Sequence, residues 1–276
     1  MGALAPCTWD GESVTGHVSM LQLTAVSKYF GGLQVLDGLD LAIPERGVFG
    51  LIGPNGAGKT TVFNLITGLL APTSGSIEFR GQRLNGMAPH RVTRCGLART
   101  FQNVRLFKEM TLSENVLVAL SGRQRSSPLS VFLPLPSYRR AVRREQERAH
   151  ELLAKVGLTA KANLLAGSLS YGEQRRLEIA RALATEPKLL LLDEPAAGMN
   201  TAEKLRLMED LVKLHESGLA LLIIEHDMRF IMGLCQQITV LNFGRVIACG
   251  APDAIRAHPE VIEAYLGRDG IEAPQL

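Results

Sequence analysis

Residues 53–61 read Gly-Pro-Asn-Gly-Ala-Gly-Lys-Thr-Thr and fit the pattern G-x-x-x-x-G-K-S/T. An apolar run of strand length, residues 47–52, precedes this stretch, and a segment with helical spacing, residues 61–66, follows it. Glycines let the loop turn its amide groups toward a phosphate, and the helix adds the positive end of its dipole. The stretch therefore predicts a phosphate-binding loop between a buried strand and a helix.

Two side chains of this loop have specific expected roles. Lys59 is expected to reach the β- and γ-phosphates of a nucleotide, and Thr60 to offer its hydroxyl to Mg²⁺. A glycine-rich turn that merely joins a strand to a helix is the alternative, but the register of Lys59-Thr60 and both flanks favour the phosphate loop. The residues expected to contact the nucleotide here are Gly53, Asn55, Gly56, Ala57, Gly58, Lys59, Thr60 and Thr61.

A second acidic element follows a buried strand. The run Leu189–Leu192 is apolar throughout, as in a buried parallel strand, and Asp193 and Glu194 come directly after it. Open α/β sheets place ligands at this edge, so Asp193 is expected to hold Mg²⁺ and Glu194 to deprotonate the attacking water. Alone, such a pair could simply cap the next helix. The upstream phosphate loop favours the catalytic interpretation.

Residues 169–174, Leu-Ser-Tyr-Gly-Glu-Gln, precede a strongly helical stretch, residues 175–184. Ser170 is a natural N-cap, and Glu173 three residues later completes a capping box. Gly172 leaves room for a ligand to approach this helix end. Local sequence alone is equally consistent with a plain helix cap, and it does not identify which phosphate the end would contact.

In this order and spacing, the motifs resemble those of the nucleotide-binding subunits of ATP-binding cassette (ABC) transporters, over residues 21 to about 266. The resemblance implies an α/β fold: a phosphate-loop NTPase core with a β-rich sector and an inserted α-helical subdomain. It implies ATP hydrolysis with Mg²⁺. It also implies that Ser170, Gly172 and Glu173 complete the site of a second subunit across a head-to-tail dimer.

The same resemblance gives roles to three further residues. Phe30 falls where the family stacks an aromatic ring on adenine, with Tyr29 as the competing candidate. Gln102 matches the loop glutamine that contacts Mg²⁺ and the attacking water. His226, after the apolar run 219–224, matches the histidine that contacts the γ-phosphate. Asn200 departs from the family's usual aspartate and keeps its hydrogen-bonding shape without its charge.

The expected organisation is a flexible N-terminal extension at 1–20, an ATPase core with the β sector at 21–102 and 169–276, and an inserted helical subdomain at 103–168. Residues 21–26 and 35–43 are predicted as strands of the β sector. Within the insert, helices are predicted over 110–119 and 141–156.

The stretches 99–107 and 264–267, together with Asn200, are similar to subunits for branched-chain amino-acid uptake. Cargo never touches such a subunit, so this inference is associational. Urea or amide uptake and lipopolysaccharide export are the closest alternatives. Soluble ABC ATPases of DNA repair, chromosome organisation and translation are a different class. Repair and chromosome members insert coiled coils or zinc modules, which the spacing from Lys59 to Ser170 lacks, and translation members normally carry two cassettes where this chain has one. A phosphate-loop kinase would lack the signature helix that follows residues 169–174.

Composition is that of an ordinary globular chain, with 46% hydrophobic and 21% charged residues and a net charge of +3. This charge gives no reason to expect nucleic acid as a partner. The scattered cysteines, at positions 7, 95, 235 and 249, are expected to be reduced. We find no apolar run of about 20 residues and no secretory signal.

The expected partners are a second ATPase subunit (another copy or a sister chain), transmembrane permeases and, indirectly, a periplasmic or lipid-anchored solute-binding protein. The expected location is the cytoplasmic face of the bacterial inner membrane, where the chain would be peripheral.

Overall fold

The computed structural model describes residues 19–102, 105–122 and 136–266. The chain forms two compact units. The core unit contains the described residues up to Arg99 together with Lys188–Pro195 and the described residues from Gly218 onward. The helical unit contains the described residues of Thr100–Pro187 and Ala196–Ser217. Most of the predicted extension at 1–20 lies outside the described residues.

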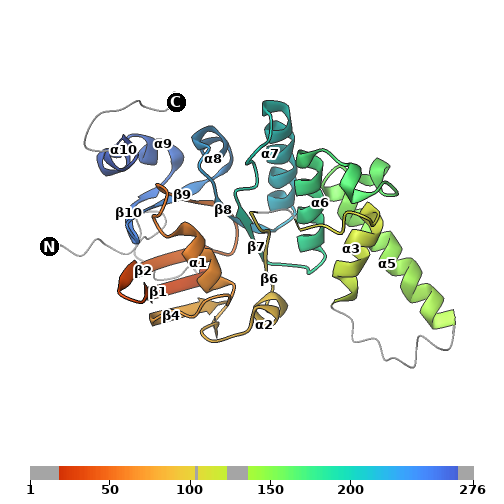
Figure 1. Ribbon diagram of the computed structural model, residues 1–276, viewed down its shortest axis with the longest axis horizontal. Helices are drawn as coiled ribbons and strands as arrows, with labels where there is room; N and C mark the ends of the chain where they lie inside the picture. The colour runs from red at the N-terminus through yellow and green to blue at the C-terminus, as the bar shows by residue number, and fades with distance from the viewer. Residues whose placement is uncertain (1–18, 103–104, 123–135, 267–276) are drawn as a thin grey trace. The chain divides into compact units, whose positions relative to one another are not determined.

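A six-stranded sheet with the order β10-β9-β3-β8-β7-β6 organises the core unit (Figure 1). The strands from β9 through β3, β8 and β7 to β6 run parallel, whereas β10 pairs with β9 in the antiparallel sense. Each residue of β3, β7 and β8 is buried, which explains why their sequences are continuous apolar runs. The strands of this sheet are β3 Val48–Ile52, β6 Leu97–Arg99, β7 Leu189–Asp193, β8 Ala220–Ile224, β9 Gln237–Asn242 and β10 Arg245–Gly250.

A second sheet of the core unit is antiparallel and has the order β2-β1-β4-β5. Its strands are β1 Ser19–Phe30, β2 Leu33–Pro44, β4 Ser74–Phe79 and β5 Gln82–Arg83. Buried and exposed residues largely alternate along β2 from Leu36 to Ile43, as expected for a sheet with one face on the core. The predicted strands at 21–26 and 35–43 are thus present and longer than expected.

Five helices of the core unit are described: α1 Lys59–Ile66, α2 Pro89–Arg94, α8 Met228–Leu234, α9 Pro252–Arg256 and α10 Pro259–Leu266. The α1 helix buries its apolar side chains, Val62, Phe63, Leu65 and Ile66, in one cluster with residues of both sheets. This packing holds the helix, and therefore the loop before it, firmly against the strands.

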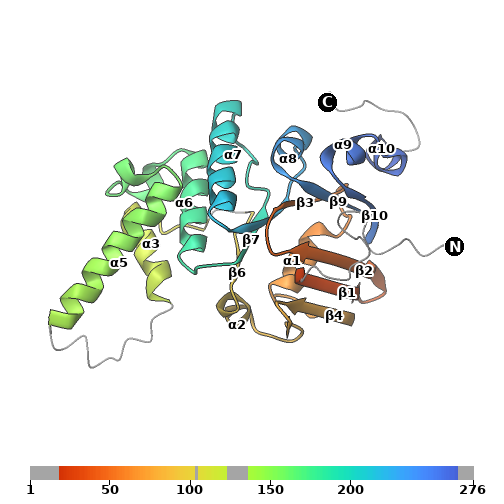
Figure 2. The same ribbon diagram turned by 180° about the vertical axis from the view of Figure 1, so that it is seen from behind.

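The helical unit is built from α3 Leu112–Ser121, α5 Pro136–Lys155, α6 Tyr171–Leu183, α7 Thr201–Glu216 and two short 3₁₀ turns, Thr159–Lys161 and Ala166–Ser168 (Figure 2). The predicted helices at 110–119 and 141–156 correspond to α3 and α5. The unit is larger than the predicted insert at 103–168, because α6 and α7 also belong to it. The apolar side chains of α6 that are buried include Leu177, Ile179 and Ala180.

Two general expectations can be compared with the structure. Cys95 and Cys235 carry free thiols, and burial raises the pKa of Cys235 to about 12. Cys249 is disulfide-bonded, so the expectation that every cysteine is reduced is wrong for this residue. Among the helices in the described ranges, none combines the length and apolar character needed to cross a bilayer.

Candidate functional site

The strand order brings three predicted segments to one edge of the core unit. Ile224, at the end of β8, pairs with Leu51 of β3 on one side and with Asp193 of β7 on the other. Because these neighbouring strands are parallel, the residues that follow them lie side by side. The phosphate loop, the Asp193-Glu194 pair and the Glu225-His226 pair therefore meet at the carboxyl ends of β3, β7 and β8.

The predicted phosphate loop connects β3 to α1. Gly58 precedes the helix with φ 102°, and the helix start has neither a side-chain cap nor an acidic residue in its first turn. A Cβ on Gly53, where φ is 149°, would lie 2.1 Å from the carbonyl oxygen of Leu241. The loop thus needs glycine at these positions. Its helix end leaves amide groups available to an anion.

The Lys59 ammonium folds back onto this loop. Its Nζ donates hydrogen bonds to the carbonyl oxygens of Gly53 at 2.6 Å and Pro54 at 2.9 Å. Burial lowers the pKa of Lys59, and the nearby Glu194 and Asp193 carboxylates oppose that shift. One cation and two carboxylates therefore converge beside the loop, as a site for a phosphate and a metal ion requires.

Asp193 ends β7 and is paired with an arginine. Arg99, the last residue of β6, donates from Nη2 to Asp193 Oδ2 at 2.7 Å. The two side chains are 7% and 5% exposed. The acidic residue predicted to hold Mg²⁺ thus has a buried cationic partner, and no site role was predicted for this arginine.

Glu194 has a backbone conformation that is uncommon for a residue other than glycine. Its φ is 47°, in the left-handed region, and its N–H donates to the carbonyl oxygen of Ile224 at 2.9 Å. The hydrogen bond to β8 holds this conformation in place. Such strain often concentrates at functional positions, and here it falls on the predicted catalytic base.

His226 follows β8 and Glu225. The Glu225 side chain is buried, and its Oε2 accepts a hydrogen bond from the His226 N–H at 3.1 Å. The imidazole Nδ1 lies 3.8 Å from the same oxygen, and the His226 side chain is 65% exposed. The buried glutamate therefore orients the backbone at His226, while the ring faces solvent where a ligand can reach it.

Two aromatic residues end β1 and are candidates for contact with a base. Phe30 is 45% exposed, and the Lys28 ammonium lies 5.0 Å from its ring centroid. Tyr29 is similarly exposed, at 42%. Consecutive strand residues point to opposite faces, so the two rings offer alternative surfaces to a ligand.

Gln102 belongs to the helical unit, where its backbone is bound by Arg175 of α6. Arg175 donates from Nη1 to the Phe101 carbonyl oxygen at 2.6 Å and from Nη2 to the Gln102 carbonyl oxygen. Glu178 accepts from the Phe101 N–H at 3.2 Å and pairs with Arg175 at 3.3 Å. Burial raises the pKa of the Glu178 carboxyl, and the Phe101 N–H and Arg175 counteract it.

The Arg175–Glu178 pair thus fixes the predicted glutamine loop to the same helix whose N-terminal end carries Ser170. Neither Arg175 nor Glu178 was predicted from the sequence to belong to the site. The helical spacing i, i+3 was a usable signal for the pair itself, but it does not indicate which backbone the pair binds.

The predicted capping box at the start of α6 is confirmed. The Ser170 hydroxyl accepts a hydrogen bond from the Glu173 N–H, and the Glu173 carboxylate accepts one from the Ser170 N–H. The Ser170 hydroxyl also donates to Glu203 Oε1 at 3.1 Å. A Cβ on Gly172 would lie 2.8 Å from this Glu203 carboxylate, so Gly172 leaves room for it.

Asn200 caps α7. Its Oδ1 accepts from the Glu203 N–H at 3.0 Å, and Glu203 Oε2 accepts from the Asn200 N–H at 3.2 Å. The asparagine therefore serves as a helix cap without bringing a further negative charge beside Glu203. Glu203 connects the start of α7 to the start of α6 within the helical unit.

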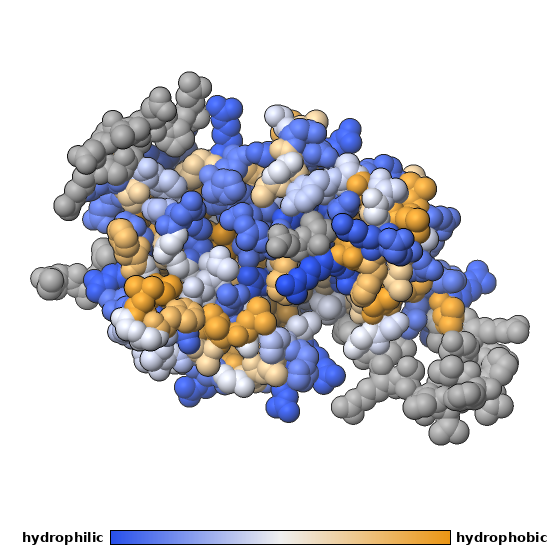
Figure 3. All heavy atoms as spheres, viewed as in Figure 1, coloured by the Kyte–Doolittle hydropathy of each residue, from blue (hydrophilic) through white to orange (hydrophobic). Residues whose placement is uncertain are grey.

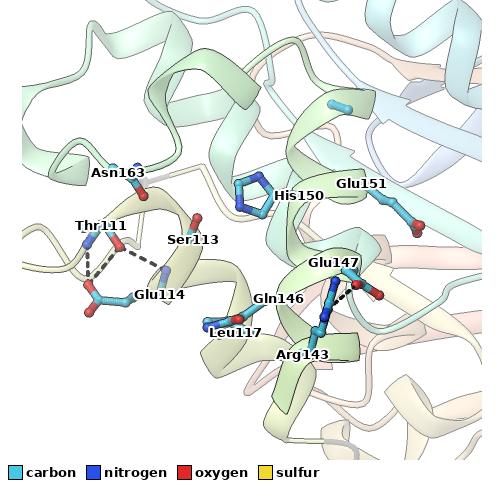
Figure 4. Close-up of a pocket in the computed structure, with 11 residues that line it drawn as sticks. Thr111, Ser113, Glu114, Leu117, Arg143, Gln146, Glu147, His150, Glu151 and Asn163 are labelled. Carbon is cyan, nitrogen blue, oxygen red and sulfur yellow. Dashed lines mark hydrogen bonds and ion pairs between the residues drawn. The ribbon is translucent and has the colours of Figure 1, made fainter. Parts of the chain in front are cut away.

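The helical unit contains a groove between α3 and α5 (Figure 4). Glu114, on its wall, bonds to the Thr111 N–H and hydroxyl at 2.7 and 2.9 Å, and Glu147 pairs with Arg143 at 3.1 Å. These carboxylates are engaged within their own helices. The groove contains none of the residues predicted to bind nucleotide.

The residues of the core unit fit a magnesium ion that is shared with a bound phosphate. Within the described ranges, no three His, Cys, Asp or Glu side chains gather to form a metal site. Magnesium commonly takes one or two protein oxygen ligands and completes its shell with substrate phosphates and water. A hydroxyl at Thr60 and a carboxylate at Asp193 are oxygen donors of this kind. Gln102, the other residue predicted for this role, belongs to the helical unit.

The strand–loop–helix, the carboxylates at the sheet edge and the converging lysine define a phosphate-loop nucleotide-binding protein. Comparison with known proteins specifies the family. The family model for ABC transporters matches residues 36–197, and a model named branched-chain amino acid ATP-binding cassette transporter matches residues 245–271. The chain belongs to the ATP-binding cassette transporter family, and it is an ATP-binding ATPase of that family.

Curated relatives are similar over most of their length. The chain is 47% identical to the high-affinity branched-chain amino acid transport ATP-binding protein BraF of Pseudomonas aeruginosa, over 90% of this chain and 98% of that protein. It is 45% identical to the corresponding protein LivG of Escherichia coli, with the same coverage. Identity to the lipopolysaccharide export system ATP-binding protein LptB of Acidithiobacillus ferridurans is 35%, over 90% of this chain and 97% of that protein.

Solved structures agree on the fold. The ADP conformation of MJ1267, an ATP-binding cassette of an ABC transporter, superimposes with a TM-score of 0.79 at 31% identity. This match covers 91% of the present chain and 100% of the other. A dimeric structure of the ATP-binding cassette MJ0796, bound to ADP and Pi, gives a TM-score of 0.70 at 28% identity, covering 84% and 99% of the two chains.

Proposed function

We propose that this chain is the ATP-hydrolysing subunit of an importer for branched-chain amino acids. The observation that carries the proposal is the 47% identity to the branched-chain amino acid protein of Pseudomonas aeruginosa, which extends over 98% of that protein. The family model at residues 245–271 has the same association. The lower identity to a lipopolysaccharide export subunit, 35%, makes export the second candidate.

In this proposal two subunits, either two copies or this chain and a sister, enclose two ATP molecules. Each ATP is bound by the phosphate loop of one subunit and by Ser170, Gly172 and Glu173 of the other. A lone subunit leaves the γ-phosphate half-coordinated and hydrated, which makes hydrolysis slow. The dimeric cassette bound to ADP and Pi among the similar structures supports a paired arrangement.

Within one site, the predicted residues divide the chemistry. Lys59 leaves its loop carbonyls and binds the β- and γ-phosphates, while Phe30 stacks on the adenine. Thr60, Asp193 and Gln102 would hold Mg²⁺, which would neutralise charge on the phosphates. Glu194 accepts the proton of the attacking water, and His226 contacts the γ-phosphate. The convergence of Lys59, Asp193 and Glu194 supports this division.

Permease subunits dock on the helical unit near residues 103–118 in this proposal. Apolar side chains reach the surface of this unit (Figure 3), and those near this segment are Phe107, Met110 and Val118 at 46%, 37% and 42% exposure. Exposed apolar groups of this kind favour a protein partner. Such docking would hold the chain at the cytoplasmic face of the membrane, with a solute-binding protein acting on the far side through the permeases.

The cargo is tested by co-purifying the chain with its permeases from native membranes and reconstituting the complex in vesicles. Leucine, isoleucine and valine, presented with the solute-binding protein, should stimulate ATP hydrolysis and accumulate. Urea and lipopolysaccharide serve as competing substrates. Stimulation by either of these, and not by the amino acids, would reject the proposed cargo.

The catalytic base is tested with Glu194→Gln. This variant should bind ATP with nearly unchanged affinity, because the carboxylate acts on water and not on the nucleotide. Hydrolysis should fall by about 10³-fold or more, since general base catalysis and its geometry are lost together. The variant should also accumulate as an ATP-bound dimer in size-exclusion chromatography. Hydrolysis at the wild-type rate would exclude Glu194 as the base.

A further inference from the structure

Among the described residues, Arg99 is the side chain that binds the Asp193 carboxylate. The Nη2–Oδ2 distance is 2.7 Å, and both groups are almost completely buried. A carboxylate removed from water in this way requires a countercharge, because an unpaired buried charge is costly. The structure therefore contains a permanent cation at the residue proposed to hold a metal cation.

The position of this cation is fixed from several sides. Arg99 Nη1 donates to Asn64 Oδ1 of α1 at 2.7 Å, and the guanidinium lies 5.4 Å from the ring centroid of Phe63. Arg99 itself ends β6, so it joins three elements of the core unit, α1, β6 and β7. A guanidinium bound at both ends cannot withdraw from Asp193 without breaking its bond to Asn64.

We propose that Arg99 is a positioning residue that takes the place of the metal at Asp193 in the nucleotide-free subunit and opposes the metal when it arrives. It orients the carboxylate through Oδ2 while no metal is present. Its fixed positive charge then lowers the affinity of the site for a second cation. The metal and the arginine share one carboxylate, so their interactions with it are anticooperative.

This inference rests on the proposed role of Asp193 as a magnesium ligand. The inference adds that Mg²⁺ strengthens nucleotide binding less in this chain than it would if the Asp193 carboxylate had no Arg99 beside it. Removing the charge of Arg99 should therefore strengthen the metal dependence, whereas a merely structural arginine would leave it unchanged or weaken it.

The counterion role is tested without metal or nucleotide, by thermal unfolding in EDTA. Arg99→Met should lower the Tm by about 5 °C or more, because it leaves Asp193 unpaired. Adding Asp193→Asn to this variant should restore most of the loss, since the buried charge is then gone. Arg245→Met is the matched control. It breaks the exposed Arg245–Asp37 pair of the same unit and should cost less than about 2 °C.

The metal effect is tested with a fluorescent ADP analogue, as the ratio of its Kd in EDTA to its Kd in Mg²⁺. Arg99→Met should raise this ratio by about 5-fold or more over wild type, within the usual range of coupling between sites. Arg99→Lys, which keeps the charge, should stay within about 2-fold. Direct Mn²⁺ titration followed by electron paramagnetic resonance should show the same order.

If Arg99→Met is too unstable to measure, Arg99→Gln removes the charge and retains hydrogen-bonding groups, and the same rise is expected. An unchanged or lower ratio in the charge-removing variant overturns the Arg99 proposal. If the Arg99 variants fail in this way but Asp193→Asn abolishes the Mg²⁺ effect, only the role of Arg99 is rejected and Asp193 remains the metal ligand. If Asp193→Asn leaves the Mg²⁺ effect at the wild-type value, the metal assignment of Asp193 fails as well.

Discussion

Two helix starts are proposed to bind the phosphates of ATP, and they are built differently. The α1 helix of the core unit begins after Gly58 with no side-chain cap and no acidic residue in its first turn. The α6 helix of the helical unit begins after Ser170, whose hydroxyl caps the helix, and Glu173 closes the capping box. The first start has no side chain bonded to its amide groups, whereas at the second the Ser170 hydroxyl already accepts from the Glu173 N–H.

The difference extends to the charges beside each helix start. At α1 the charged side chain beside the helix start is the Lys59 ammonium. It donates hydrogen bonds to carbonyl oxygens of the loop, and a phosphate can take their place. At α6 the carboxylate of Glu203 accepts from the Ser170 hydroxyl and lies close to Gly172. An anion at α6 must therefore displace another anion. We propose that α1 binds nucleotide in a single subunit, and that α6 engages only when a second subunit presents a phosphate.

The largest expected effect lies at α1. Lys59→Ala should weaken ATP binding by about 100-fold or more, because the cation that neutralises the β- and γ-phosphates is lost. Binding of a fluorescent ATP analogue to the isolated chain measures this directly. Lys213→Ala, at an exposed position on α7, is the control and should bind as wild type does. Unchanged binding by Lys59→Ala would remove the basis for calling α1 the primary site.

Local features of both helix starts were predictable from the sequence. The loop between β3 and α1, and the capping box of Ser170 and Glu173, depend on residues within a few positions of one another. Glycine permissiveness and capping are local properties, so the pattern alone was sufficient. The buried strands β3, β7 and β8 were predictable for the same reason, because each is a continuous apolar run.

Partners distant in the chain were not predictable. Arg99 and Asp193 are separated by 94 positions and meet only because β6 and β7 are neighbours in the sheet. Likewise, Arg175 reaches the backbone of Phe101 across 74 positions. Periodicity shows which face of an element is buried, but it does not encode the order of strands. The extent of the helical unit was underestimated for a related reason, because the apolar face of α6 packs within it.

A smaller effect on binding, but a clear one on turnover, is expected at α6. Gly172→Ala should leave ATP binding to the isolated chain within about 2-fold, because α1 alone supplies that affinity. Turnover by the assembled pair should fall by about 10-fold or more, because a methyl group would occupy the approach to the helix end. Losing one donor or contact at a reacting phosphate lowers the hydrolysis rate by at least this much. Steady-state hydrolysis by the reconstituted transporter measures the loss.

The control for this variant is Gly122→Ala, at the end of α3, where φ is −62°. Among the described residues, an added Cβ there would meet the Ala119 carbonyl oxygen, at 3.5 Å. It should hydrolyse ATP as wild type does. If Gly172→Ala weakened binding to the isolated chain as strongly as Lys59→Ala, the two helix starts would not differ in the way proposed.

The smallest expected effect concerns the internal anion at α6. Glu203→Gln retains a side chain that can complete the Asn200 capping box, so α7 should keep its stability. It removes the negative charge beside Ser170 and Gly172, which a phosphate from the second subunit must otherwise displace. In a Glu194→Gln background, which prevents hydrolysis, the ATP concentration for half-maximal dimer formation should fall by about 2- to 5-fold. Analytical ultracentrifugation across an ATP titration measures this shift.

Asn200→Asp, which instead adds a charge beside Glu203 while preserving a cap, should move the midpoint the other way. Equal midpoints in all three proteins would mean that Glu203 does not compete with the phosphate, and the contrast between the two helix starts would then depend on capping alone.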